Sequence, residues 1–497
     1  MSTLSFTGQR QVRFPAPDIA RGFMLALIAL ANVPFWVSFL PDYPAPGRAT
    51  LDTMTNVDQW WFVVRSMFVD RRAYPLFSIL FGFGMAIMAK RTIERERRVA
   101  LEALPAELNA DWVPLQWQLF HEAVERRARR AASRLIRRRG WWMLAIGAVH
   151  AIVFSGDIIG AYGLVAVVFA EVIVMTRVWP RVVAAGFFSL LCLLGIAAIG
   201  AWSDEAMTLE HHLGSSVGWA YPLMSLGTWL FATPMTLIAS MVVPCVMIGV
   251  GVQRWGALQD PRGHRGALGA VAALGLLVGA LGALPYALGQ LAWVRVMGAG
   301  LSFPLYHAAG VAGACGWLAL LALLGGGPRE DLGVVSSFLS AIGRRSMTAY
   351  LSQTLVFAVV FVVLGLAGVR SLGVAVAGLI ALGVWALIGV GCVLSDFRGA
   401  TRGPAERFLR WLVARSAHAL PLPPLPMHTV ATRGSAPSAG AGVPAYPDAP
   451  GGAVTPGTPD TSSVTDARAA VSAIERTWNP PGPEGRSNEG QASPGGA

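Results

Sequence analysis

Long apolar stretches that carry almost no charge recur along this chain between residues 22 and 394. The hydrocarbon core of a bilayer is about 30 Å thick, so a helix needs roughly 20 apolar residues to cross it. A helix also satisfies its own backbone hydrogen bonds, which lipid cannot do. The stretches therefore predict an all-α, polytopic integral membrane helical bundle of about ten transmembrane helices, and they exclude a soluble fold.

Turns and charged loops divide the apolar stretches into ten expected crossings. These are residues 22–40, 60–88, 141–154, 158–175, 182–202, 228–250, 267–286, 301–324, 347–366 and 374–394. An even number of crossings returns the chain to the side on which it started.

The charge balance supports this interpretation. Hydrophobic residues make up 54% of the chain and charged residues only 13%, and the formal net charge is +11. In a soluble protein such an excess of positive charge suggests nucleic-acid binding. Here the basic residues gather in a few loops between apolar stretches, as they do in the cytoplasmic loops of membrane proteins. We therefore expect both termini in the cytoplasm, the plasma (inner) membrane of a bacterium as the location, the lipid bilayer as a partner and no nucleic acid.

The composition along the chain predicts four regions. A cytoplasmic N-terminal segment covers residues 1–21, and a transmembrane domain covers residues 22–394. A basic juxtamembrane segment at 395–420, with a short helix expected at 405–413, precedes a tail at 421–497 rich in Pro, Gly, Ala and Ser. Because such a tail buries too little apolar surface to offset its ordering entropy, we expect it to be disordered.

The largest cytoplasmic loop, residues 90–139, is strongly basic at both ends. Its second half, near residues 119–136, predicts a basic helix that lies on anionic headgroups. A solvated charged helix is an equally good interpretation.

The four cysteines stand singly inside apolar stretches, so they predict core residues and neither disulfides nor metal ligands. No cleavable signal is evident, and the first apolar stretch is expected to stay as a retained helix.

Polar groups inside membrane spans are costly, so each one is a candidate for function. His150 lies about ten residues beyond Arg139, near mid-membrane by the rise of a helix, and Asp157 follows it by seven residues. If the helix persists, that spacing is about 10 Å, so the two groups are not expected to touch but can line one cavity with Tyr162. The catalytic candidates are His150 and Asp157. The alternative is structural: His150 bonds a neighbouring helix and Asp157 caps the next one.

Candidates for binding a substrate or donor lie in two other segments. Asp18 and Arg21 stand at the cytoplasmic mouth of the first span, and Asn32 lies deeper in it. The ninth span opens with an unusually polar face, which carries Arg344, Thr348, Tyr350 and Gln353. Hydrogen bonding between helices is the alternative role of the ninth-span residues.

Four segments together resemble the YeiB-like bacterial membrane proteins, the family of domain of unknown function 418 (DUF418). They are residues 18–23 with Asn32, residues 74–84, residues 147–150 with 156–159, and Gly343-Arg344 with 348–351. Residues 403–406 and Arg410 also resemble the closing motif of the family. The resemblance extends from about residue 13 to residue 415. It implies a distant similarity to membrane acyltransferases, which move acyl groups from cytosolic donors onto extracytoplasmic sugars.

Two functions from different classes follow. In the first, the chain is acyltransferase-like and modifies a cell-envelope acceptor, with His150 as general base and with Arg21 and Arg344 holding the phosphates of an acyl-CoA donor. In the second, it transports or exports a small polar or lipid-linked solute through the same polar groups. The sequence does not decide whether the chain is an enzyme. It signals no metal and no certain cofactor, and acyl-CoA is expected only as a donor substrate.

Overall fold

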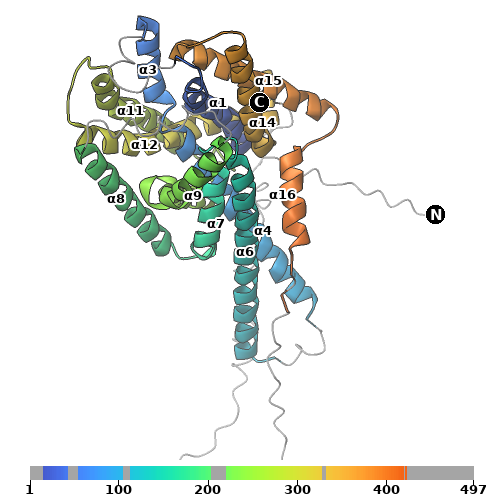
Figure 1. Cartoon of the computed structure of the whole chain (residues 1–497). Coiled ribbons are helices and arrows are strands. Elements are labelled where there is room, and N and C mark those ends of the chain that lie inside the picture. The colour runs from blue at the N-terminus through green and yellow to red at the C-terminus, as the bar shows by residue number, and fades with distance from the viewer. Residues whose placement is uncertain are drawn as a thin grey trace, which may run out of the picture. The chain divides into compact units, whose positions relative to one another are not determined.

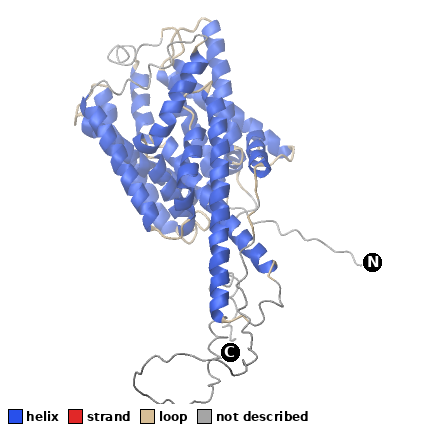
Figure 2. Cartoon of the chain, turned by 60° about the horizontal axis from the view of Figure 1, so that its bottom comes forward, coloured by secondary structure: helices blue, strands red, loops and turns tan. Residues whose placement is uncertain are grey.

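The computed structural model describes residues 15–42, 54–104, 112–202, 220–326, 332–418 and 420–421. All regular elements within these residues are helices, as Figure 2 shows. They are α1 (Ala16–Val37), α3 (Asn56–Phe68), α4 (Ala73–Glu102), α6 (Pro114–Ala151), α7 (Ile159–Val174), α8 (Trp179–Trp202), α9 (Tyr221–Ala239), α10 (Val242–Trp255), α11 (Arg265–Gln290), α12 (Ala299–Gly325), α13 (Val334–Gly343), α14 (Ser346–Leu366), α15 (Val374–Phe397) and α16 (Pro404–Arg415) (Figure 1). The predicted all-α class is confirmed. Residues 422–497, which hold nearly all of the predicted tail, lie outside the described residues.

Among the described residues, eight helical segments are long and apolar enough to cross a membrane. They are Ala16–Val37, Asn56–Glu102, Trp179–Gly200, Tyr221–Ala239, Arg265–Gln290, Ala299–Gly325, Ser346–Leu366 and Val374–Phe397. The shorter apolar helices α7, α10 and α13 accompany them. This is the composition of a multi-pass membrane protein, whereas the expected ten crossings and the cytoplasmic termini stay predictions.

The second expected crossing is broken into α3 and α4. Arg71, at the break, has a positive φ of 59°, a conformation that costs energy for a residue with a side chain. The neighbouring Arg72 is fully buried, and its guanidinium donates to the carbonyls of Ser66 and Asp70, each at 2.6 Å, and to that of Gly279. These three carbonyls accept hydrogen bonds from the two terminal nitrogens of an arginine that a continuous apolar helix would leave without such partners.

The sixth expected crossing is also broken, between α9 and α10. Ser240 is extended, and α10 begins two residues later. Pro244 favours the break, because its ring would clash with the carbonyl of residue 240 if one helix ran through both. The apolar pattern concealed this break because both halves are equally hydrophobic.

Helix α1 packs against four other helices, α12, α13, α14 and α15. The close approach of α13 depends on Gly343, where an added Cβ would lie 1.8 Å from the carbonyl oxygen of Asp18. The indole of Trp385, on α15, donates to the carbonyl of Gly22 at 3.1 Å. These contacts fix the start of α1, which carries Asp18 and Arg21.

The chain divides into two compact units, Met1–Arg95 with Ala128–Leu420 and Glu96–Arg127 with Pro421–Ala497. The smaller unit contains part of the expected basic loop, which is helical over most of its described length. Two of its described arginines pair within the unit: Arg97 with Glu125 at 2.5 Å and Arg127 with Glu96 at 2.6 Å. Binding of this segment to anionic headgroups stays a prediction.

Candidate functional site: an arginine-lined cavity beside a buried histidine

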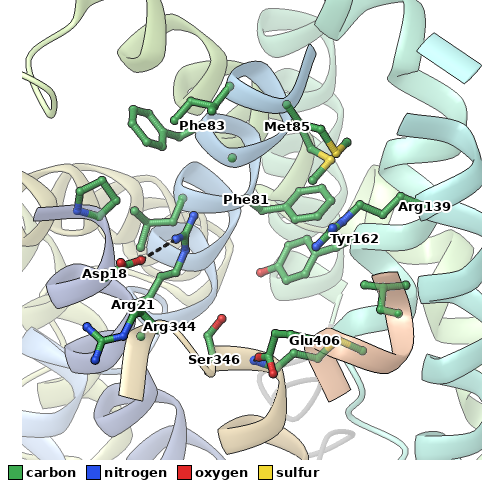
Figure 3. A pocket seen from close by; sticks show the side chains of 18 of the residues that line it. Asp18, Arg21, Phe81, Phe83, Met85, Arg139, Tyr162, Arg344, Ser346 and Glu406 are labelled. Atoms are coloured by element: carbon green, nitrogen blue, oxygen red, sulfur yellow. Dashed lines mark hydrogen bonds and ion pairs between the residues drawn. The ribbon is translucent and has the colours of Figure 1, made fainter. Parts of the chain in front are cut away.

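A cavity of about 1470 Å³ lies within the larger unit, among α1, α4, α6, α7, α14 and α16. Seven arginines and two carboxylates are among the described residues that line it. The arginines are Arg21, Arg91, Arg95, Arg139, Arg344, Arg402 and Arg410, and the carboxylates are Asp18 and Glu406. In Figure 3 the side chains of Arg21 and Arg139 reach toward the cavity from different helices. The excess of arginines over carboxylates in the lining makes the cavity attractive to an anion.

Arg139 lines the cavity close to two other positive charges, those of Arg410 and Arg21. Within the described part of the chain no carboxylate lies at salt-bridge distance from it, and its buried Nε has no hydrogen-bond partner. Burial, together with the nearby positive charges of Arg410 and Arg21, lowers the pKa of Arg139 to about 10. It is therefore still protonated at neutral pH, and a bound anion would relieve the repulsion.

Neither carboxylate of the cavity forms a salt bridge with Arg139, although the nearby charge of Glu406 offsets part of the repulsion. Asp18 pairs with Arg21 at 3.1 Å (Figure 3). Glu406 accepts hydrogen bonds from the backbone N–H groups of Met347 (2.7 Å) and Thr348 (3.1 Å) and from the hydroxyl of Thr348 (2.6 Å). Glu406 thus caps the start of α14, where exposed N–H groups and the helix dipole favour negative charge.

Arg344 lines the cavity, but the residues that bind its guanidinium do not. It shares the carboxylate of Asp396 with Arg345, which lies 2.6 Å from Asp396 and is itself buried. The hydroxyl of Ser340 accepts a further bond from Arg344 at 2.8 Å. Two arginines on one carboxylate leave net positive charge beside the cavity.

The rest of the cavity is lined by apolar and aromatic side chains, mainly from α4. Phe77 and Phe81 stack on the ring of Tyr162, with centroids 4.6 and 5.1 Å apart. Met143 and Ile159 continue this lining. A ligand that fits the whole cavity would therefore combine an anionic group with an apolar part.

His150 and Asp157 lie beside the cavity and not in its lining. The Nδ1 atom of His150 is 2.7 Å from Oδ1 of Asp157, so the prediction that these groups do not touch is wrong. Because α6 ends at Ala151, the chain turns back and returns Asp157 to the histidine. The turn requires Gly147, where a Cβ would lie 2.5 Å from the carboxylate of Asp157.

Both groups have further partners. The Nε2 atom of His150 is 2.9 Å from the hydroxyl of Thr354, and the second carboxylate oxygen of Asp157 accepts from the Gly160 N–H (2.7 Å) and the Trp229 indole (3.3 Å). With its proton on Nδ1, a neutral His150 donates to Asp157 and accepts from Thr354. This order of hydroxyl, imidazole and carboxylate is the one by which serine hydrolases activate a hydroxyl.

Tyr350 connects the two parts of the site. It lines the cavity, and its ring centroid lies 5.3 Å from that of His150. With Tyr350, the predicted residues Asp18, Arg21, Tyr162 and Arg344 also line the cavity.

Three predicted binding residues do not line the cavity. Thr348 bonds Glu406, and Gln353 donates to the carbonyl of Leu25 at 2.9 Å, as expected for contacts between helices. Asn32 is half-buried in α1.

Arg139, Thr354 and Trp229 were not predicted as site residues from the sequence. Arg139 is the last basic residue before an apolar stretch, a position that sets topology in any membrane protein and so gave no specific signal. Thr354 follows Gln353 and Trp229 lies in an apolar stretch, and only the folded chain brings them to His150 and Asp157.

The fold and the cavity define a multi-pass helical membrane protein with a positively charged internal cavity. Residues 252–416 match the family described as "Protein of unknown function (DUF418)", which supports the DUF418 family that the sequence motifs predict. No curated protein and no solved structure matches the chain.

Proposed function

We propose that this chain is an acyltransferase-like membrane enzyme that takes an acyl group from acyl-CoA and passes it to an acceptor of the cell envelope. The observation that carries the proposal is the cavity itself, which joins seven arginines to an apolar part ending at Tyr350, beside His150.

The arginines would bind the phosphates of the donor. A guanidinium binds phosphate through parallel charge-assisted hydrogen bonds, and no carboxylate of the described residues forms a salt bridge with Arg139. Arg21 and Arg344 would add to this binding from α1 and from the start of α14. The acyl arm would then lie along Phe77, Phe81 and Tyr162.

His150 would act as general base once Tyr350 turns aside. The acceptor hydroxyl would replace that of Thr354 at Nε2 and give its proton to His150 as its oxygen attacks the thioester carbonyl. The C–S bond breaks, and the thiolate of coenzyme A takes the proton from His150. Asp157 would orient the imidazole and stabilise its charged form.

The test begins with binding of labelled acyl-CoA to the purified protein in nanodiscs. We expect Arg139→Gln to weaken binding about tenfold or more, because a hydrogen bond to a charged group contributes roughly 1.5–3 kcal/mol. The matched control is Arg134→Gln, since Arg134 is exposed on the same helix and does not line the cavity. His150→Gln should keep binding and lose transfer to isolated envelope material. Equal binding by the two arginine variants, or transfer by His150→Gln, would contradict the proposal.

A second function has its own support. The breaks between α3 and α4 and between α9 and α10 are of a kind found where transporters form binding sites from interrupted helices. Transport of a small polar or lipid-linked solute would appear as uptake into vesicles that contain the protein. Uptake that His150→Ala leaves intact would exclude this histidine from transport.

A further inference from the structure

The last described helix, α16, has two different faces. The residues Pro404, Arg407, Phe408, Trp411, Ala414 and Arg415 form one exposed stripe at helical spacing. Phe408 is 52% exposed and Trp411 53%, far more than aromatic side chains in a protein core. The two rings stack on each other with centroids 6.0 Å apart, and the guanidinium of Arg415 lies 5.5 Å from the Trp411 ring.

The opposite face is packed against the bundle. Leu409 is buried, and Glu406 attaches the helix to the start of α14. At the other end, the hydroxyl of Ser416 accepts from the indole of Trp142 on α6 at 3.0 Å. The exposed stripe is therefore held outward by contacts at both ends of α16.

The position of α16 along the chain indicates what covers the stripe. The membrane-spanning α15 ends at Phe397, which is 83% exposed as a lipid-facing residue would be, and α16 starts at Pro404. So short a link keeps α16 at the membrane surface where α15 ends. A helix with aromatic residues flanked by arginines is suited to that interface, because the rings enter the acyl boundary and the guanidinium groups bind anionic headgroups.

We propose that the Phe408–Trp411 stripe of α16, with Arg407 and Arg415, binds the anionic surface of the membrane that the bundle spans. Glu406, Leu409 and Arg410 on the same helix line the cavity. Binding of the stripe to lipid therefore holds one wall of the cavity in place. This inference does not depend on the acyl donor.

The experiment places an environment-sensitive fluorophore on the stripe through Ala414→Cys in the full chain. The protein is reconstituted in vesicles of phosphatidylcholine, with or without phosphatidylglycerol, and quenched by lipids that carry a nitroxide near the headgroup. We expect apolar emission and strong quenching in the anionic vesicles. The unsubstituted chain measures labelling of the native cysteines, of which Cys192, Cys245 and Cys392 are buried.

Two variants in this background separate the contributions. Phe408→Ser with Trp411→Ser should move the emission toward that of water. Arg407→Gln with Arg415→Gln should lower the docking equilibrium about fivefold per arginine in anionic vesicles, because each basic residue near such a surface contributes about 1 kcal/mol. Arg262→Gln with Arg265→Gln is the charge-matched control, since both arginines are exposed and lie outside α16, Arg262 between α10 and α11 and Arg265 at the start of α11.

Emission like that of water in both kinds of vesicle would overturn the proposal. So would equal quenching with and without phosphatidylglycerol. If the fluorophore shows apolar emission in native membranes but not in vesicles that contain only this protein and lipid, the stripe binds a protein partner and the proposal is wrong. If a variant fails to fold, hydrogen exchange of the α16 amides in the unsubstituted chain decides, because docking predicts slower exchange in the anionic vesicles.

Discussion

The hydroxyl of Thr354 lies 2.9 Å from Nε2 of His150, although 204 residues separate them in the chain. This contact ties α14 to the end of α6 and leaves His150 with a partner on each ring nitrogen. Thr354 would therefore position the imidazole and be displaced when an acceptor binds.

Replacing Thr354 separates this positioning role from simple packing. Thr354→Val should lower the rate constant of transfer and leave binding of acyl-CoA unchanged, whereas Thr354→Ser, which keeps the hydroxyl, should restore the rate. The stability cost should be on the order of 0.6 kcal/mol, as for other hydrogen bonds between membrane helices. Transfer kinetics and thermal unfolding in detergent measure the two effects. Equal rates for the valine and serine variants would remove the positioning role.

Gly147 tests the turn that brings Asp157 to His150. Gly147→Ala puts a methyl group 2.5 Å from the Asp157 carboxylate and from the Gly160 nitrogen, so the turn must shift. We expect a loss of stability of about 1–3 kcal/mol, which is typical of overpacking. Gly269→Ala is the control, because a Cβ there meets no atom within 4 Å, and a glycine in a helix interior is worse than alanine by about 1 kcal/mol. Thermal midpoints that fall equally in the two variants would show that the close approach at Gly147 is unimportant.

Glu406 tests the attachment of α16 to α14. Glu406→Gln keeps the shape of the side chain but removes the charge that accepts three hydrogen bonds at the start of α14. We expect faster hydrogen exchange throughout Pro404–Arg415, because a charged acceptor forms the stronger bonds. Glu122→Gln, at an exposed glutamate paired with Arg126, should leave this exchange unchanged. Unaltered exchange in Glu406→Gln would mean that other contacts hold α16.

The sequence predicted the class of the fold because lipid imposes a strong pattern. Long apolar stretches identified the helices, and each expected crossing falls on a helical segment. The breaks were not predicted, since the hydropathy of a stretch does not record where Pro244 or Arg71 interrupts the backbone. The short α13 was also missed, because ten residues are too few to signal a crossing.

The site was predicted in part for a similar reason. His150 was selected because an imidazole at membrane depth is costly, and Arg21 and Arg344 because arginines near the cytoplasmic ends of spans can bind phosphate. Their partners come from distant segments, so no spacing in the sequence reveals them. The distance between His150 and Asp157 was wrong because it assumed a continuous helix, whereas the chain turns at Ala151.

Asp396 tests how much the ion pairs of Arg344 and Arg345 contribute to the stability of the bundle. Its carboxylate binds Arg344 and the buried Arg345, so Asp396→Asn leaves two guanidinium groups without a counter-charge. Removing one partner from a buried ion pair costs about 3–5 kcal/mol, and the partial exposure of Asp396 places this case at the lower end. Asp42→Asn is the matched control, because Asp42 pairs with Arg370 on the surface, where water screens the charges. Thermal unfolding in detergent should therefore show a large decrease in midpoint for Asp396→Asn and little change for Asp42→Asn. Similar midpoints for the two variants would mean that water reaches Arg345 and replaces the carboxylate.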